Sequence, residues 1–260
     1  MSGKKVAILA TSADKMGEVA TGAWSEEISG AYYTFLDAGC AVTIYSVKGG
    51  KITIDAGSLS DQFKTEGAYY TFLDAGCAVT IYSVKGGKIT IDAGSLSDQF
   101  KTENDKRFES SGDVAKLESS PAMATIKVDE IDCIYLAGGH GTCVDFPTDE
   151  VGAVVSDVYA KGKVVGAVCH GPMGLVKAKD GDKPLVAGKK IAAFSDVEEG
   201  QVGLTEKVPF LLEAKLKELG CEYVAGDPWS ETATRDGKLV TGQNPQSSVK
   251  VAKLCLEALA

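Results

Sequence analysis

The chain is poor in histidine and in positive charge, and it has no long apolar segment. Its 260 residues include only two histidines, and 36 acidic residues against 27 basic ones give a net charge of −9. Such a balance repels nucleic acid on average, so a nucleic-acid-binding protein is not expected. No stretch approaches the roughly 20 apolar residues of a membrane span, which argues against a membrane protein.

Several other signals are missing. The N-terminus leads into an apolar run that is too short for a signal-peptide core. Seven cysteines without paired spacing indicate free thiols in a reducing compartment, so we expect a cytoplasmic protein. Neither a Walker loop nor a dinucleotide fingerprint follows a strand, and the histidines and cysteines have no zinc-like spacing. We therefore expect neither a metal nor a cofactor.

Short apolar runs alternate with segments of helical spacing. The expected strands are Val6–Ala10, Ala41–Val47, Ile131–Ala137, Val164–Val168, Lys190–Phe194 and Leu239–Gly242. The expected helices are Ala31–Ala38, Asp149–Ala160, Val208–Leu219 and Ser247–Leu259, and residues 104–122 form a surface helix or loop. This alternation predicts an α/β fold whose mainly parallel sheet is covered on both faces. We expect one domain over residues 1–260.

Residues 67–103 repeat residues 30–66 without one change. Solenoid repeats drift in sequence and need at least three units, so this pair does not indicate a solenoid. A recent duplication, an engineered insertion or a gene-model error would each explain it. We expect the first copy to fill the usual helix and strand. The second copy would then be an extra βα segment at the sheet edge or a poorly packed excursion.

Cys169 stands where a buried strand turns sharply into a helix. The strand Val164–Val168 precedes it, and the expected helix opens after His170. A thiol at a helix N-terminus is favoured as the thiolate, and small neighbours such as Gly171 suit the tight turn of a nucleophile elbow. A free cysteine is more often a buried apolar filler. The adjacent histidine and glycine favour a nucleophile here.

Both histidines follow strands in glycine-rich turns, which favours a shared site. Backbone N–H groups of Gly138, Gly139, His140 and Gly171 are candidates for binding a substrate oxyanion, although a plain glycine turn is the alternative. Glu26 and Glu27 lie at a helix start, where they either complement the helix dipole or act as general acid and base. Glu198 and Glu199 follow another strand, and either is a candidate to orient His170.

The sequence resembles the ThiJ/PfpI superfamily, and within it the branch of glutathione-independent glyoxalase III enzymes and heat-inducible stress chaperones. The resemblance covers nearly the whole chain apart from one repeat copy. It is carried by TGAWSEE (21–27), AGGHGTCVDFP (137–147), AVCHGP (167–172), FSDVEE (194–199), VPFLLE (208–213) and LVTGQNPQSS (239–248). It implies a flavodoxin-like three-layer sandwich related to class I glutamine amidotransferase domains.

The resemblance also implies an activity and a set of roles. Cys169 would be the nucleophile, Glu27 the acid/base, and His170 and Glu199 the remaining members of a Cys-His-acid triad. Methylglyoxal, a small 2-oxoaldehyde, would become D-lactate through a Cys169 hemithioacetal and an enediol, the activity also catalogued as D-lactate dehydratase. A homodimer is expected. The alternatives are a holdase chaperone, for which Cys169 is dispensable, and a deglycase, peptidase or amidase that uses the same thiol.

Overall fold

The structure is a computed structural model, which describes residues 3–47, 80–81 and 122–260. The α-helices are α1 Ser25–Asp37, α4 Thr142–Asp145, α5 Asp149–Ala160, α6 Asp196–Gln201, α7 Leu212–Glu218 and α8 Ser248–Leu259. The 3-10 helices are η5 Met123–Thr125, η6 Val128–Glu130, η7 Gly171–Leu175 and η8 Pro245–Ser247. The strands are β1 Lys5–Ala10, β2 Lys15–Met16, β3 Val19–Ala20, β4 Ala41–Ser46, β5 Thr80–Ile81, β6 Cys133–Leu136, β7 Val164–Val168, β8 Lys179–Asp180, β9 Lys183–Pro184, β10 Lys190–Ile191, β11 Glu222–Tyr223, β12 Ala233–Asp236 and β13 Leu239–Gly242.

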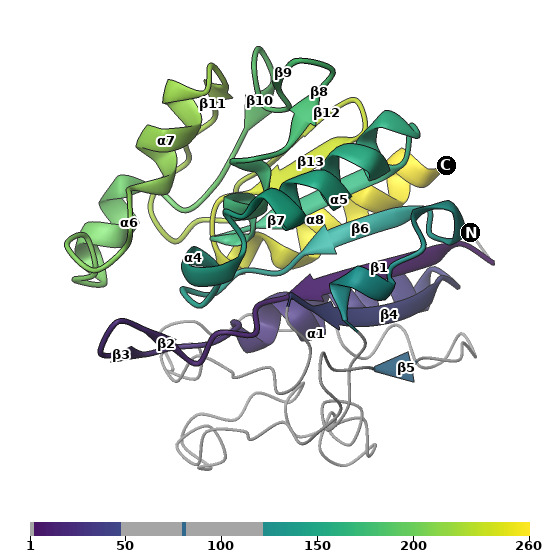
Figure 1. The fold of residues 1–260 in the computed structure, drawn as a ribbon, viewed down its shortest axis with the longest axis horizontal. Coiled ribbons are helices and arrows are strands. Elements are labelled where there is room, and N and C mark those ends of the chain that lie inside the picture. Colours follow the sequence, from purple (N-terminus) through teal and green to yellow (C-terminus); the bar gives the residue numbers. More distant parts are fainter. Residues whose placement is uncertain (1–2, 48–79, 82–121) are drawn as a thin grey trace.

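A seven-stranded sheet forms the centre of the fold, in the order β12-β13-β7-β6-β1-β4-β5 (Figure 1). Its neighbours pair in parallel except β12 and β13, which form an antiparallel hairpin. A parallel sheet aligns the carboxyl ends of its strands at one edge, where ligands bind in such folds. The expected α/β fold with a mainly parallel sheet is therefore confirmed.

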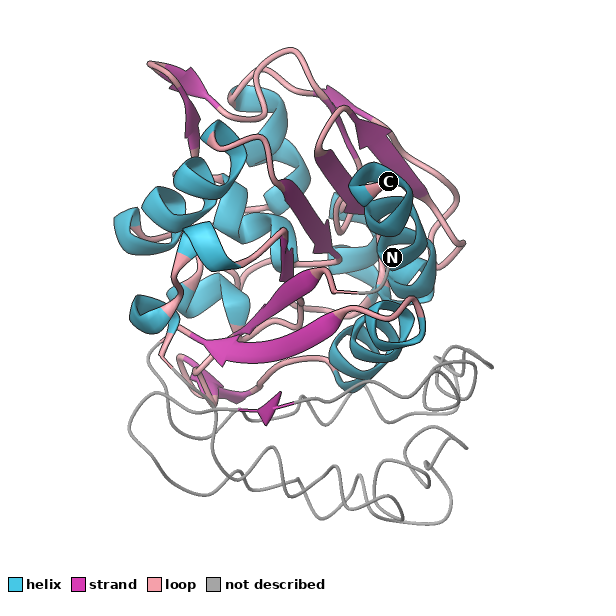
Figure 2. Ribbon diagram, turned by 90° about the vertical axis from the view of Figure 1, so that its right-hand side faces the viewer, coloured by secondary structure: helices cyan, strands magenta, loops and turns pink. Residues whose placement is uncertain are grey.

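Helices cover both faces of the sheet (Figures 1 and 2). Helices α1 and α8 pack together on one face, and α5 packs on β6 and β7 from the other. The sequence of β1 explains this arrangement, because Ile8 joins the core cluster beneath α1 and α8 while Leu9 joins the cluster beneath α5. Consecutive side chains of a strand point to opposite faces, so a strand buried on both sides is apolar throughout.

The helix boundaries follow local signals. Thr148 caps α5 by accepting a hydrogen bond from the Val151 N–H, and Gly162 takes a left-handed conformation (φ 69°) just after the helix ends. Gly220 (φ 90°) likewise follows α7. The expected bounds of α5 and of the strands β7 and β13 are confirmed. Among the described residues, no helix combines the length and apolar character needed to cross a bilayer.

The strand expected over Lys190–Phe194 is the main error of the sequence-based prediction. Only Lys190–Ile191 forms a strand, and it pairs with β11 in a separate two-stranded sheet. The run still reaches the central sheet, because the Ala192 N–H donates to Thr241 Oγ1 and the Phe194 N–H donates to the Cys169 carbonyl. Buried apolar character alone does not tell which sheet a short run joins.

The first repeat copy supplies α1 from Gly30 onward and β4, the neighbour of β1. Of the second copy, the described residues are Thr80 and Ile81, which form β5 at the edge of the sheet. They pair in parallel with Thr43 and Ile44, their own counterparts in the first copy. The rest of residues 67–103 and residues 104–121 lie outside the described residues, so the extra βα segment stays a prediction.

Removal of residues 67–103 should leave the fold intact, because β1 pairs with the first copy and β5 adds only a short edge pairing. We expect cooperative thermal unfolding with a midpoint shifted by no more than about 4 °C, which corresponds to roughly 1 kcal/mol in a chain of this size. Loss of cooperative unfolding would contradict this. Thr80→Pro in the full chain is a matched control, since proline disfavours strand pairing at β5 without shortening the chain.

Candidate active site

A tight turn at the carboxyl end of β7 presents Cys169. Its φ of 58° lies in the left-handed region, which among the described non-glycine residues only Trp229 shares. The Cys169 N–H donates to the Gly242 carbonyl, which fixes the turn against β13. A Cβ on Gly171 would lie 2.1 Å from the Leu136 carbonyl oxygen, so the turn requires glycine there. Strained backbone of this kind is typical of functional sites.

The Cys169 side chain is 2% exposed and contacts two titratable groups. Its Sγ lies 3.4 Å from His170 Nδ1, and Glu27 hydrogen-bonds the sulfur. Burial, and then the Glu27 carboxylate, raise the pKa of the thiol well above its ordinary value. Both effects oppose the thiolate that the sequence predicts. The segment that follows is the five-residue 3-10 helix η7, which is too short to offset burial by its dipole.

Glu27 lies in the first turn of α1, and its side chain is fully buried. Its Oε2 accepts a hydrogen bond of 2.6 Å from the Gly138 N–H. A Cβ on Gly138 would lie 2.4 Å from that oxygen and 2.8 Å from the His170 nitrogen, so only glycine allows the three segments to meet. The Gly138 N–H therefore positions Glu27, whereas the sequence analysis expected it to bind a substrate oxyanion.

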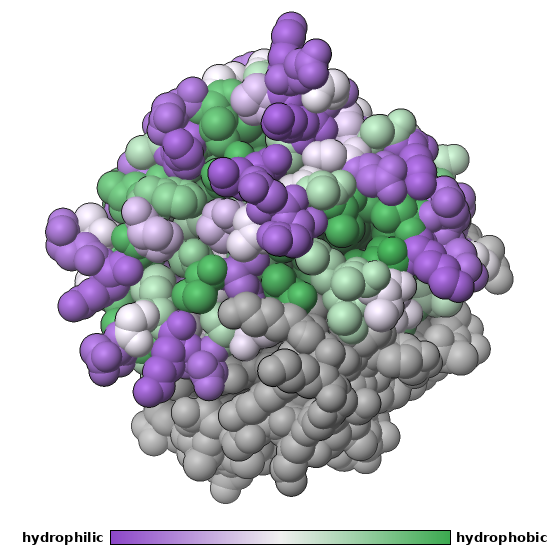
Figure 3. Space-filling view, viewed as in Figure 1, coloured by the Kyte–Doolittle hydropathy of each residue, from purple (hydrophilic) through white to green (hydrophobic). Residues whose placement is uncertain are grey.

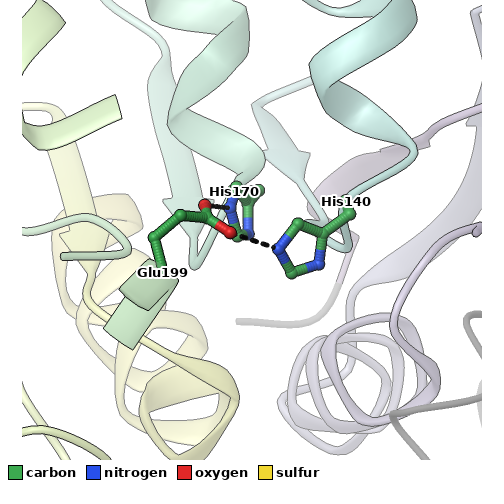
Figure 4. Close-up of side chains that lie close together, drawn as sticks. All are labelled: His140, His170 and Glu199. Atoms are coloured by element: carbon green, nitrogen blue, oxygen red, sulfur yellow. Dashed lines mark hydrogen bonds and ion pairs between the residues drawn. The ribbon is translucent and has the colours of Figure 1, made fainter. Parts of the chain in front are cut away.

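Glu199 joins the two histidines (Figure 4). Its Oε2 lies 2.8 Å from His170 Nε2, and its Oε1 lies 2.9 Å from His140 Nε2. Burial alone would raise the pKa of this carboxyl, but the hydrogen bonds from both histidines lower it to about 2. An ionised carboxylate can only accept, so each imidazole carries its proton on Nε2. His170 Nδ1 therefore faces the thiol as a base.

Of the two acidic candidates after Phe194, Glu199 orients His170. Glu198 instead forms a capping box with Ser195 at the start of α6 and accepts a hydrogen bond of 3.0 Å from Asn244 Nδ2. The two neighbours point to different sides because residues one apart on a helix do not share a face. Their order along the chain could not settle which one reaches the histidine.

A small cavity of about 20 Å³ adjoins the thiol. It is lined by Trp24, Gly139, His140, Cys169, Phe194, Val202, Trp229 and Pro245. That volume suits about one water molecule, so a three-carbon substrate requires the walls to move. Gly139 (φ 94°) has the place expected of it beside the cysteine. Sequence reasoning missed Trp229, which follows no strand and belongs to none of the motifs above.

Among the described residues, one group could also hold a metal ion, because its ligand atoms all lie within 4.8 Å of one another: His140, His170 and Glu199. Two imidazoles and one carboxylate are a donor set that several transition metals accept. In this geometry both Nε2 atoms donate to Glu199. The three groups therefore satisfy one another through protons, as a catalytic triad does.

The fold and the site together define an α/β protein with a cysteine on a nucleophile elbow and a Cys-His-Glu hydrogen-bonded chain. Residues 58–258 match the model of the DJ-1/PfpI family, and the protein belongs to this family. It is similar to the Saccharomyces cerevisiae glutathione-independent glyoxalase HSP31, at 38% identity over 143 residues, which cover 52% of this chain. It is also similar to Candida albicans Glyoxalase 3, at 40% identity over 146 residues and 53% of this chain. The matches span 60% and 61% of the two relatives, respectively.

Solved structures support the fold over nearly the whole chain. The Francisella tularensis Rapid Encystment Protein 24 kDa superposes with a TM-score of 0.79 at 31% identity, covering 99% of both chains. The glyoxalase III of Candida albicans superposes with a TM-score of 0.76 at 24% identity, covering 98% of this chain and 97% of that one. The resemblance to the ThiJ/PfpI superfamily and its glyoxalase branch is thus confirmed.

Glu199→Gln should change how stability depends on pH. The folded-state pKa of Glu199 is about 2, against an ordinary value of 4.5, so its charge stabilises the fold above pH 4.5 and this contribution is lost as pH falls toward 2. We expect the variant to lose about 3 kcal/mol of unfolding free energy at pH 6 and less at lower pH. Urea unfolding across pH would measure this; a difference that does not shrink with acid would contradict it.

We expect the side chain of Trp229 to restrict access to the cavity and its backbone conformation to be strained. Its left-handed φ of 62° disfavours any side chain with a Cβ, while its indole covers the cavity beside Phe194. We expect Trp229→Gly to be more stable than Trp229→Ala by about 1 kcal/mol, because both lose the ring but only glycine relieves the strain. Both variants should let iodoacetamide reach Cys169 faster. Equal unfolding free energies of the two variants would show that the backbone of Trp229 is not strained.

Proposed function

We propose that this protein is a glutathione-independent glyoxalase that converts methylglyoxal to D-lactate. The observation that carries the proposal is the buried thiol of Cys169, which hydrogen-bonds Glu27 and lies 3.4 Å from His170 Nδ1. A thiol between two bases suits addition to an aldehyde followed by proton transfer. The names of the Saccharomyces and Candida relatives, both glyoxalases, support the same activity.

The proposed reaction uses each of these groups in turn. His170 Nδ1 takes the thiol proton as Sγ attacks the aldehyde carbon C1, and returns it to the new oxyanion to complete the hemithioacetal. Glu27 then removes the hydrogen from C1 and delivers it to C2 through an enediol. Water cleaves the resulting thioester, which releases the hydroxy acid and restores the thiol. The electron pair moves within the substrate, so the reaction itself needs no external oxidant or reductant.

Glu199 supports the first step electrostatically. When His170 becomes an imidazolium, the anionic carboxylate 2.8 Å from its Nε2 stabilises the new charge. A pKa of about 2 keeps that carboxylate ionised at neutral pH. Because burial raises the pKa of the Cys169 thiol, transfer of its proton to His170 accompanies the attack on the aldehyde. The homodimer and the cytoplasmic location expected from the sequence remain predictions.

A holdase chaperone is the second candidate, and it requires exposed apolar surface. On the face seen in Figure 3, hydrophilic residues are interspersed with apolar ones. In the part of the chain that the structure describes, the exposed large hydrophobic side chains are Val144 (42% exposed) and Val197 (58% exposed). Single exposed apolar residues are ordinary on a globular surface. The described surface therefore favours the enzyme.

Cys169→Ala should abolish turnover. Without the sulfur no hemithioacetal forms, so we expect D-lactate production from methylglyoxal, with no glutathione added, to fall at least about 1,000-fold. An enantiomer-specific lactate assay measures this, and Cys221→Ala is a matched control because that cysteine lies away from the cavity. Turnover by Cys169→Ala, or no D-lactate from the unaltered chain, would overturn the proposal. Suppression of aggregation in the absence of turnover would favour the holdase.

A further inference from the structure

The proposed isomerisation moves two protons, and the groups assigned so far carry only one of them. Glu27 transfers hydrogen from C1 to C2. The hemithioacetal also has a hydroxyl on O1 and a carbonyl at O2, whereas the thioester product has the carbonyl at O1 and the hydroxyl on O2. A proton must therefore pass from O1 to O2, and a group that touches both oxygens would accelerate this transfer.

His140 lines the cavity beside the thiol and offers a second imidazole nitrogen there. In the neutral imidazole whose Nε2–H donates to Glu199, the lone pair lies on Nδ1. Figure 4 shows Nδ1 of His140 turned away from the carboxylate. The ring lines the cavity together with Cys169, and it lies 4.1 Å, centroid to centroid, from the ring of His170. The single carboxylate thus holds two imidazoles in the same tautomer.

We propose that His140 is a second catalytic base, whose Nδ1 carries the proton from O1 to O2 of the substrate. This inference rests on the proposed glyoxalase function. In the enediolate, Nδ1 takes the proton of the O1 hydroxyl and becomes an imidazolium, while O1 becomes the thioester carbonyl oxygen. The imidazolium then protonates O2. His140 returns to its starting state, and the step requires no co-reactant.

The same carboxylate makes this step favourable. Glu199 Oε1, 2.9 Å from His140 Nε2, neutralises the transient imidazolium as Oε2 does for His170. The two histidines act at different times, so Glu199 never has to balance two cations at once. The two histidines have different roles because they occupy different positions. His170 Nδ1 faces the sulfur, whereas His140 lines the cavity that the substrate must enter.

The His140→Gln variant distinguishes the loss of a base from the loss of the hydrogen bond to Glu199. The glutamine amide can still donate an N–H to Glu199, but it offers no base in place of Nδ1. We expect kcat for D-lactate formation to fall about 100-fold, within the range for loss of a general base. Methylglyoxal should still protect Cys169 from iodoacetamide as in the unaltered chain, because hemithioacetal formation does not need His140.

Two results would overturn the inference. The first is a kcat for His140→Gln within about threefold of the unaltered chain, well short of the loss expected for a general base. The second is loss of turnover and of protection together, because His140 would then only position Glu199. If the unaltered chain forms no D-lactate, the proposed function fails before any variant is compared. If His140→Gln does not fold, His140→Ala with added imidazoles replaces it, and turnover must rise with the basicity of the imidazole.

Discussion

The site depends on one buried carboxylate that two histidines share. Glu199, at the start of α6, binds His140 from the loop after β6 and His170 from the loop after β7. Removing this side chain would leave two buried imidazoles without their acceptor, and a buried polar group without a partner is expensive. The same two hydrogen bonds set the tautomer of both rings. Glu199, which is 3% exposed, therefore determines which nitrogen of each histidine can accept a proton.

Sequence reasoning located the site because its residues follow buried strands. Cys169 and His140 come directly after apolar runs, and parallel strands bring such positions to one edge of the sheet. It could not choose between Glu198 and Glu199, since that choice depends on which face of α6 turns inward. The expectation of a Cys169 thiolate rested on local sequence in the same way. Local sequence suggests a helix dipole, whereas burial and the distant Glu27 decide the pKa.

Two further features were beyond any local pattern. The strand expected over Lys190–Phe194 joins another sheet, because pairing depends on where β11 lies after the intervening helices. Trp229 reaches the cavity through a left-handed backbone that its residue type disfavours. The strand β4, which belongs to the first copy of the identical repeat, lies beside β1. Glu27, which precedes only this copy, lies in the same helix α1 as the first residues of the copy.

The burial of the Cys169 side chain has a consequence for oxidative chemistry. Peroxides attack thiolates, and they do so fastest where the sulfur meets solvent. The Cys169 side chain is 2% exposed, so it does not meet solvent in this arrangement. A peroxide and an aldehyde must both enter through the walls of the same small cavity before they reach the sulfur. Access to the cavity therefore limits the oxidation of this cysteine as it limits the entry of a substrate.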